Sequence, residues 1–213
     1  MSLRRALLAG LARALTDALF RVHAEALAGV PARGPLILAM NHVQFWEVPL
    51  IYARLYPREV HGLVLDTRWK NPALAWILNT AGAIPLKRGG VNLGSLNQAL
   101  ACLQAGEMVM IMPEGTRSHD GRLGTAHPGV LALALKSQAP IMPIVTFGGE
   151  RYPEQLKRLR RTDIYIRVGQ AFTMKEGGAQ GAIDAAARTR MLDELMYRMA
   201  ALLPDQYRGA YAS

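Results

Sequence analysis

Residues 36–49 read LILAMNHVQFWEVP, and this stretch indicates how the rest of the chain is organised. Its first part, residues 36–40, is an apolar run that predicts a short buried strand. Proline is tolerated in the first turn of a helix but not in its interior. Because of Pro49, the following helix is therefore predicted to begin between Trp46 and Val48.

The loop between this strand and this helix holds a histidine and a carboxylate. His42 lies at the carboxyl end of the predicted strand, and Glu47 lies in the first turn of the predicted helix. Residues five apart on a regular helix point about 140° away from each other, but at a loop-to-helix corner they can meet. A carboxylate that accepts one imidazole N–H leaves the other ring nitrogen free to act as a general base. The alternative is a capped helix with a surface histidine.

Beyond this stretch, strand-like and helix-like periods alternate along the chain. The predicted strands are residues 36–40, 62–65, 83–86, 108–112, 141–147 and 164–168, and the predicted helices are 46–56, 71–80, 93–105, 128–138 and 183–203. This alternation predicts an α/β fold with a mainly parallel central sheet covered by helices on both faces. No linker or repeat divides the chain, so we expect an N-terminal helical segment, residues 1–30, and a single domain, residues 31–213.

The composition favours anionic partners. The formal net charge is +9, and only 7% of the residues are aromatic. Basic proteins that bind nucleic acid usually add aromatic stacking platforms, so a lipid or phosphorylated partner is preferred and no nucleic acid is expected. No apolar window is long enough to span a membrane, and charged residues interrupt the N-terminal segment, so neither a spanning helix nor a signal peptide is expected. The single Cys102 indicates a buried thiol in a reducing compartment.

Residues 2–22 are predicted to form an amphipathic helix. One interpretation is a helix that lies in the membrane interface, with its leucines among the acyl chains and its arginines on the headgroups. The other is an ordinary helix packed on its own domain. On the first interpretation the membrane-facing residues are Leu3, Arg4, Arg5, Leu7, Leu8, Leu11 and Leu15. The basic run 151–161 is either a solvated face or a second membrane contact.

Two further segments carry polar chemistry at the ends of predicted strands. In residues 82–90, Lys87 and Arg88 place two cations before two glycines, a composition suited to phosphate or to a solvated turn. In residues 113–118, Gly115 lets the backbone approach a ligand. In the same segment Thr116 and Arg117 add donors, and Glu114 can hold a cation or an acceptor hydroxyl. Residues 140–143, an apolar segment bracketed by prolines, are structural when taken alone.

Taken together and in this order, the segments resemble the four sequence blocks of the glycerolipid acyltransferase family. The matching blocks are Asn41-His42-x4-Glu47, Gly82 to Arg88, Pro113-Glu114-Gly115-Thr116-Arg117-Ser118 and Pro140-Ile141-Met142-Pro143. The third block is the most distinctive, and the resemblance spans about residues 36–147. The end of the chain, residues 203–209, is also similar to the tail of many bacterial members. The best-known members are the bacterial 1-acylglycerol-3-phosphate acyltransferases.

The resemblance implies roles for individual residues. His42 would be the general base, and Glu47 would orient it in place of the aspartate that the family normally has. Arg88 would contact the phosphate of the acceptor, and Glu114, Gly115 and Arg117 would help to bind glycerol phosphate. No metal or prosthetic group is expected, and the acyl donor would be acyl-CoA or acyl carrier protein. The remaining histidines, His23, His61, His119 and His127, show no metal-ligand spacing.

The expected function is therefore a membrane-associated O-acyltransferase that converts lysophosphatidic acid into phosphatidic acid. It would lie peripherally on the cytoplasmic face of the cell membrane, because no spanning helix is predicted. The sequence lacks a Gly-x-Ser-x-Gly elbow, so direct attack by the acceptor hydroxyl is preferred over an acyl-enzyme. The alternatives are another lysophospholipid, a glycolipid or an amino-acid lipid as acceptor, or a non-catalytic lipid-binding protein of the same fold.

Overall fold

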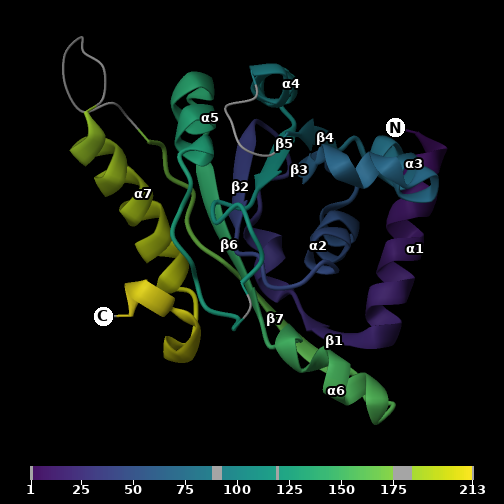
Figure 1. Ribbon diagram of the computed structural model, residues 1–213. Helices are drawn as coiled ribbons and strands as arrows, with labels where there is room; N and C mark the ends of the chain where they lie inside the picture. Colours follow the sequence, from purple (N-terminus) through teal and green to yellow (C-terminus); the bar gives the residue numbers. More distant parts are fainter. Residues whose placement is uncertain (1, 88–92, 119, 175–183, 213) are drawn as a thin grey trace.

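The computed structural model describes residues 2–87, 93–118, 120–174 and 184–212 (Figure 1). Its strands are β1 (Phe20–His23), β2 (Leu36–Met40), β3 (Val60–Leu65), β4 (Ile84–Leu86), β5 (Met108–Ile111), β6 (Ile141–Phe147) and β7 (Thr162–Val168). Its α-helices are α1 (Leu3–Leu19), α2 (Glu47–Leu55), α3 (Pro72–Ala81), α4 (Leu93–Gln104), α5 (Gly129–Ser137), α6 (Tyr152–Lys157) and α7 (Ala185–Ala200). The predicted elements are present, and each predicted boundary that falls on a described residue lies within three residues of the observed one.

The strands form one sheet in the order β1-β7-β6-β2-β5-β3-β4. Strand pairs are parallel except for β6 and β7, which run antiparallel. All five residues of β2 are buried, as expected for a central strand covered on both faces. The predicted α/β fold with a mainly parallel sheet is therefore confirmed.

Alternate side chains of β2 enter two separate cores, because successive residues of a strand point to opposite faces. Ile37 and Ala39 pack with buried residues of α5 and α7. Leu36, Leu38 and Met40 pack with α2 on the other face. Figure 1 shows α5 and α7 on one side of the sheet and α2 on the other, with α1 lying outside α2.

The prediction of one helix over residues 2–22 is wrong at its end. Helix α1 stops at Leu19, and Phe20–His23 form the edge strand β1, which pairs with β7. The cause is tertiary: the Phe20 ring is 1% exposed and packs on Trp46 and Tyr152, with ring centroids 4.5 and 5.0 Å away. Burial of this ring outweighs the helical period that continues through Val22. The basic run 151–161 also contains a short helix, α6, that was not predicted.

Among the helices that the described residues form, none combines the length and the apolar character needed to cross a membrane.

Candidate active site

The polar residues of the site meet where three neighbouring parallel strands end. His42 follows β2, Glu114 follows β5, and Thr146 is the penultimate residue of β6. Because β6, β2 and β5 are adjacent and parallel, their carboxyl ends lie at one edge of the sheet. Ligands of open α/β sheets usually bind at this edge.

The structure brings His42 and Glu47 together at the predicted corner. Helix α2 begins at Glu47, so the backbone turns between the two residues and His42 Nδ1 lies 3.3 Å from Glu47 Oε2. The Glu47 side chain is 1% exposed, whereas that of His42 is 20% exposed. A carboxylate oxygen only accepts, so Nδ1–H of His42 donates to it and Nε2 keeps its lone pair.

Two further donors hold the buried carboxylate of Glu47. The backbone N–H of Val43 donates to Oε2 at 3.0 Å, and the hydroxyl of Thr146 donates to Oε1 at 2.8 Å. Asn41 in turn fixes the backbone of Thr146, accepting from its N–H at 2.8 Å and donating to its carbonyl at 2.9 Å. Both oxygens of Glu47 are therefore hydrogen-bonded, which is what burial of a carboxylate requires.

Sequence reasoning missed Thr146 and the supporting role of Asn41. The available signal was that Thr146 is the only hydroxyl residue in an otherwise apolar predicted strand, and that Asn41 directly precedes His42. The contacts also show how Glu47 fits where the resemblance implied an aspartate: its carboxylate reaches His42 with one oxygen and Thr146 with the other.

Glu114 is a second buried carboxyl at this edge. Its side chain is 4% exposed, and among the described residues Oε1 has no hydrogen-bond partner. Burial raises the pKa of Glu114 to about 7, and the negative charge of Glu47 acts in the same direction, while the backbone of His42 and Gly124 opposes both. An unpaired buried oxygen of this kind can accept a hydrogen bond from a ligand hydroxyl.

The loop that follows Glu114 is tied to His42 and leaves its donors exposed. The Ser118 N–H donates to the His42 carbonyl at 2.7 Å. Gly115 adopts φ +65°, and a β-carbon there would lie 2.7 Å from the His127 ring, so glycine is required for this turn. Thr116 and Arg117 are exposed beside it, available to an anionic ligand.

The remaining predicted ligand residues lie at the end of β4. Lys87 directly follows β4 and is exposed, at the same edge of the sheet as His42 but beyond β3. The prediction for Arg88 lies outside the described residues.

Comparisons with known proteins identify the family of this chain. A family model described as Acyltransferase matches residues 21–146, more than half of the 213 residues. The chain is 29% identical over 133 residues to a chloroplastic 1-acyl-sn-glycerol-3-phosphate acyltransferase of Brassica napus, covering 61% of this chain and 38% of that protein. It is 32% identical over 154 residues to a lyso-ornithine lipid O-acyltransferase of Pseudomonas aeruginosa, covering 71% of this chain and 58% of that protein. The chain thus spans less than two thirds of either relative.

A solved structure shares the fold. The crystal structure of the 1-acyl-sn-glycerophosphate acyltransferase PlsC of Thermotoga maritima superposes with a TM-score of 0.66 at 16% identity. The superposition covers 93% of this chain and 78% of that one.

Proposed function

Because the chain belongs to the acyltransferase family, we propose that it transfers a fatty acyl group from a thioester to the free hydroxyl of lysophosphatidic acid. The donor would be acyl-CoA or acyl carrier protein, and the product phosphatidic acid. The observation that carries the proposal is the His42–Glu47 pair, with a buried, fully hydrogen-bonded carboxylate and a free imidazole Nε2.

The chemistry follows from this arrangement. The acceptor hydroxyl gives its proton to Nε2 of His42 as its oxygen attacks the thioester carbon, and the ionised Glu47 stabilises the resulting imidazolium. When the tetrahedral intermediate collapses, the C–S bond breaks and the imidazolium returns the proton to the leaving thiolate. The exposed Arg117 and Lys87 supply positive charge for the acceptor's phosphate. The unpaired oxygen of Glu114 holds an acceptor hydroxyl.

A second acceptor class is supported by the Pseudomonas relative, whose name specifies a lyso-ornithine lipid. Such an acceptor is an amino-acid lipid without phosphate. The exposed cations at positions 87 and 117 favour the phosphorylated acceptor.

A single assay separates these possibilities: release of free thiol from acyl-CoA or acyl carrier protein in the presence of each lyso-acceptor. Lysophosphatidic acid is expected to support the fastest release. A preference for lyso-ornithine lipid would establish the second acceptor class, and no release with any acceptor would favour a non-catalytic lipid-binding protein.

The matched variants for this assay are His42→Ala and His23→Ala. His23 also faces a carboxylate, Asp163, at 3.1 Å, but on the edge strand β1. Loss of a general base costs about 10²–10⁴-fold in rate, so His42→Ala should lose transfer while His23→Ala keeps it. Retention of more than about a tenth of the rate in His42→Ala would exclude this residue as the base.

Membrane docking is proposed from the unusual orientation of α1. Its leucines Leu3, Leu7, Leu11 and Leu15 are each more than half exposed, whereas its buried residues are Ala9 and Thr16. Thr16 is buried and accepts from Arg54 of α2 at 3.0 Å. A surface helix normally buries its apolar stripe, so this exposed stripe is available to the acyl region of a membrane.

Not every residue predicted to face the membrane does so. Arg4 is exposed, but Arg5 turns inward, forming an ion pair with Glu59 and donating to the Thr80 carbonyl at 3.0 Å. Leu8 is half-buried. Helix α3, which lies beside α1 in Figure 1, adds the exposed Trp76.

A second contact is proposed at the tip after α6. Leu159 is 94% exposed in a left-handed conformation with φ +52°, within the basic run 151–161. Arg161 donates to the backbone carbonyls of Asp17 and Phe20, so the tip is held at the carboxyl end of α1. An apolar side chain among cations suits an anionic membrane surface, where each basic residue contributes about 1 kcal/mol. We propose that the protein binds peripherally to the cytoplasmic face of the cell membrane.

Sedimentation with anionic vesicles tests the docking. Deleting α1 would remove the contacts of Thr16 with α2, so the test variant replaces Leu7, Leu11 and Leu15 by serine. It should pellet poorly and lose activity on vesicle-borne acceptor, with a much smaller loss on acceptor in detergent. Tyr197→Ser, which changes an exposed aromatic residue on α7, is the matched control. If the triple variant pellets as fully as the wild type, α1 is not the anchor.

A further inference from the structure

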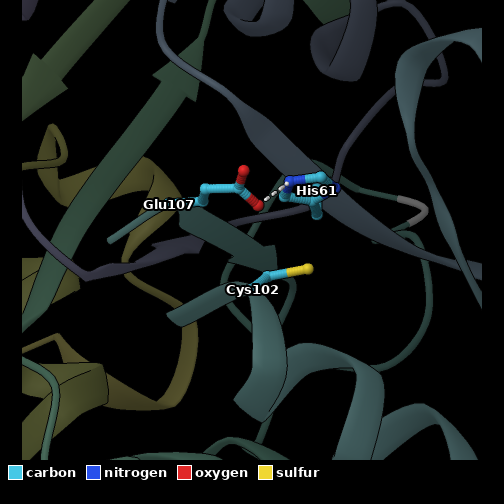
Figure 2. Close-up of side chains that lie close together, drawn as sticks. All are labelled: His61, Cys102 and Glu107. Atoms are coloured by element: carbon cyan, nitrogen blue, oxygen red, sulfur yellow. Dashed lines mark hydrogen bonds and ion pairs between the residues drawn. The ribbon is translucent and has the colours of Figure 1, made fainter. Parts of the chain in front are cut away.

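Three metal-ligating side chains gather away from the candidate active site. His61 lies on β3, Cys102 on α4 and Glu107 in the turn before β5. One ring nitrogen, the sulfur and a carboxylate oxygen all lie within 4.8 Å of one another (Figure 2). His61 pairs in register with Val109 of β5, as does Ile37 of β2. The cluster is therefore nearer the amino ends of the strands, whereas His42 lies beyond the carboxyl end of β2.

The hydrogen bonds of His61 direct its second ring nitrogen at a carboxylate. Nδ1 lies 2.8 Å from the Gly82 carbonyl oxygen, which only accepts, so Nδ1 carries a proton. In the neutral imidazole Nε2 then has a lone pair, and it faces Glu107 Oε2 at 2.8 Å. At 2.8 Å the two atoms share a hydrogen bond through a proton on either group. The same two atoms are also suitable ligands for one metal ion.

The cysteine and the burial distinguish this pair from an ordinary ion pair. The His61 side chain is 9% exposed and that of Glu107 is 33% exposed. Cys102 adds a sulfur donor next to both ligands. By contrast, His23 and Asp163 face each other at 3.1 Å on the edge strand, with both side chains 38% exposed.

We propose that His61, Cys102 and Glu107 bind a divalent transition-metal ion of the zinc type. An imidazole, a thiolate and a carboxylate are the ligands that Zn²⁺ combines in proteins, whereas Mg²⁺ and Ca²⁺ take oxygen ligands. The thiolate and the carboxylate together balance the charge of the ion. Three protein ligands leave the fourth tetrahedral position to water.

The residues around His61 fit a role in metal binding. The Gly82 carbonyl fixes the ring so that Nε2 points at the other ligands, as hydrogen-bond partners of metal-bound histidines commonly do. A β-carbon at Gly82 would lie 2.9 Å from Nδ1, so the residue must be glycine for this approach. Arg5, the cation on the Gly82 side, is paired with Glu59. An ion here would join β3, α4 and the start of β5, and through Gly82 the end of α3.

Cobalt substitution tests the site. Metal-free protein is titrated with Co²⁺, and thiolate-to-cobalt charge transfer is followed by absorption. Because the chain has a single cysteine, such a band reports Cys102 alone. We expect one Co²⁺ per chain, displaced by Zn²⁺ but not by Mg²⁺. Cys102→Ser should abolish the band, and Glu107→Gln and His61→Gln should each weaken binding by at least about tenfold. His23→Gln, in the pair without a cysteine, should bind as the wild type does.

Two results would overturn the proposal. One is the absence of the charge-transfer band in wild-type protein at excess Co²⁺. The other is an unchanged affinity in both His61→Gln and Glu107→Gln, which would mean that the thiol binds metal alone. Zn²⁺ should also raise the Tm of wild-type protein while Mg²⁺ does not. This measurement needs no variant, so it tests the proposal even if a variant fails to fold. None of these measurements uses acyl transfer, so their outcome is independent of the proposed function.

Discussion

Glu114 should make the protein less stable as the pH rises. The pKa of this carboxyl is about 7 in the folded chain, against an ordinary value of 4.5. Between these two values the unfolded chain has released its proton while the folded chain retains it, so increasing pH favours unfolding. At about 1.4 kcal/mol per pH unit, the free energy of unfolding falls by about 3 kcal/mol in total, and this full decrease is reached above pH 7. Below pH 4.5 it is absent.

The variant Glu114→Gln removes the ionisable group while keeping its shape. It should raise the free energy of unfolding by up to about 3 kcal/mol at pH 8 and change it little at pH 4.5. Urea unfolding at both pH values measures the difference. Glu154→Gln, at an exposed position of α6, is the control and should change stability little at either pH.

The same substitution should impair transfer, because the amide presents a different group to the acceptor hydroxyl. Greater stability with lower activity is the outcome expected of a buried group kept for ligand binding. An equal change of stability at pH 4.5 and pH 8 would refute the argument, since only a titrating carboxyl produces the difference.

Variants at three further residues test the site. Thr146→Val should lower kcat about ten- to hundredfold and alter its pH profile, because a hydrogen bond to a buried carboxylate contributes about 1.5–3 kcal/mol. Thr146→Ser keeps the hydroxyl and should restore both kcat and the pH profile. An equal loss of kcat in Thr146→Val and Thr146→Ser would indicate that Thr146 has only a packing role. Glu47→Asp should retain more kcat than Glu47→Ala, and equal losses would show that Glu47 does not orient His42. Arg117→Ala should raise KM for lysophosphatidic acid about ten- to hundredfold while KM for the donor stays constant. An unchanged acceptor KM would point to an acceptor without phosphate.

The sequence by itself determined the elements whose evidence is local. The five apolar residues of β2 and the position of Pro49 sufficed to predict a strand, a loop and a helix beginning between Trp46 and Val48, and the helix begins at Glu47. The corner that brings His42 to Glu47 follows from that short stretch, because residues five apart can meet only there. The alternation of strand and helix periods likewise predicted the α/β class.

Only the tertiary structure determined the features that depend on contacts between residues far apart in the sequence. Phe20–Val22 continue a helical period, and only burial of Phe20 against Trp46 and pairing with β7 convert them into a strand. The leucine period of α1 is the same whether the stripe is buried or exposed. In the folded chain Arg5 pairs with Glu59 and Asp17 pairs with Arg54, and the leucines are left exposed. Thr146 meets Glu47 from 99 residues away, and His61 meets Cys102 only because α4 covers β3. Local periodicity reports which residues can share a face, whereas contacts across the sheet determine what that face touches.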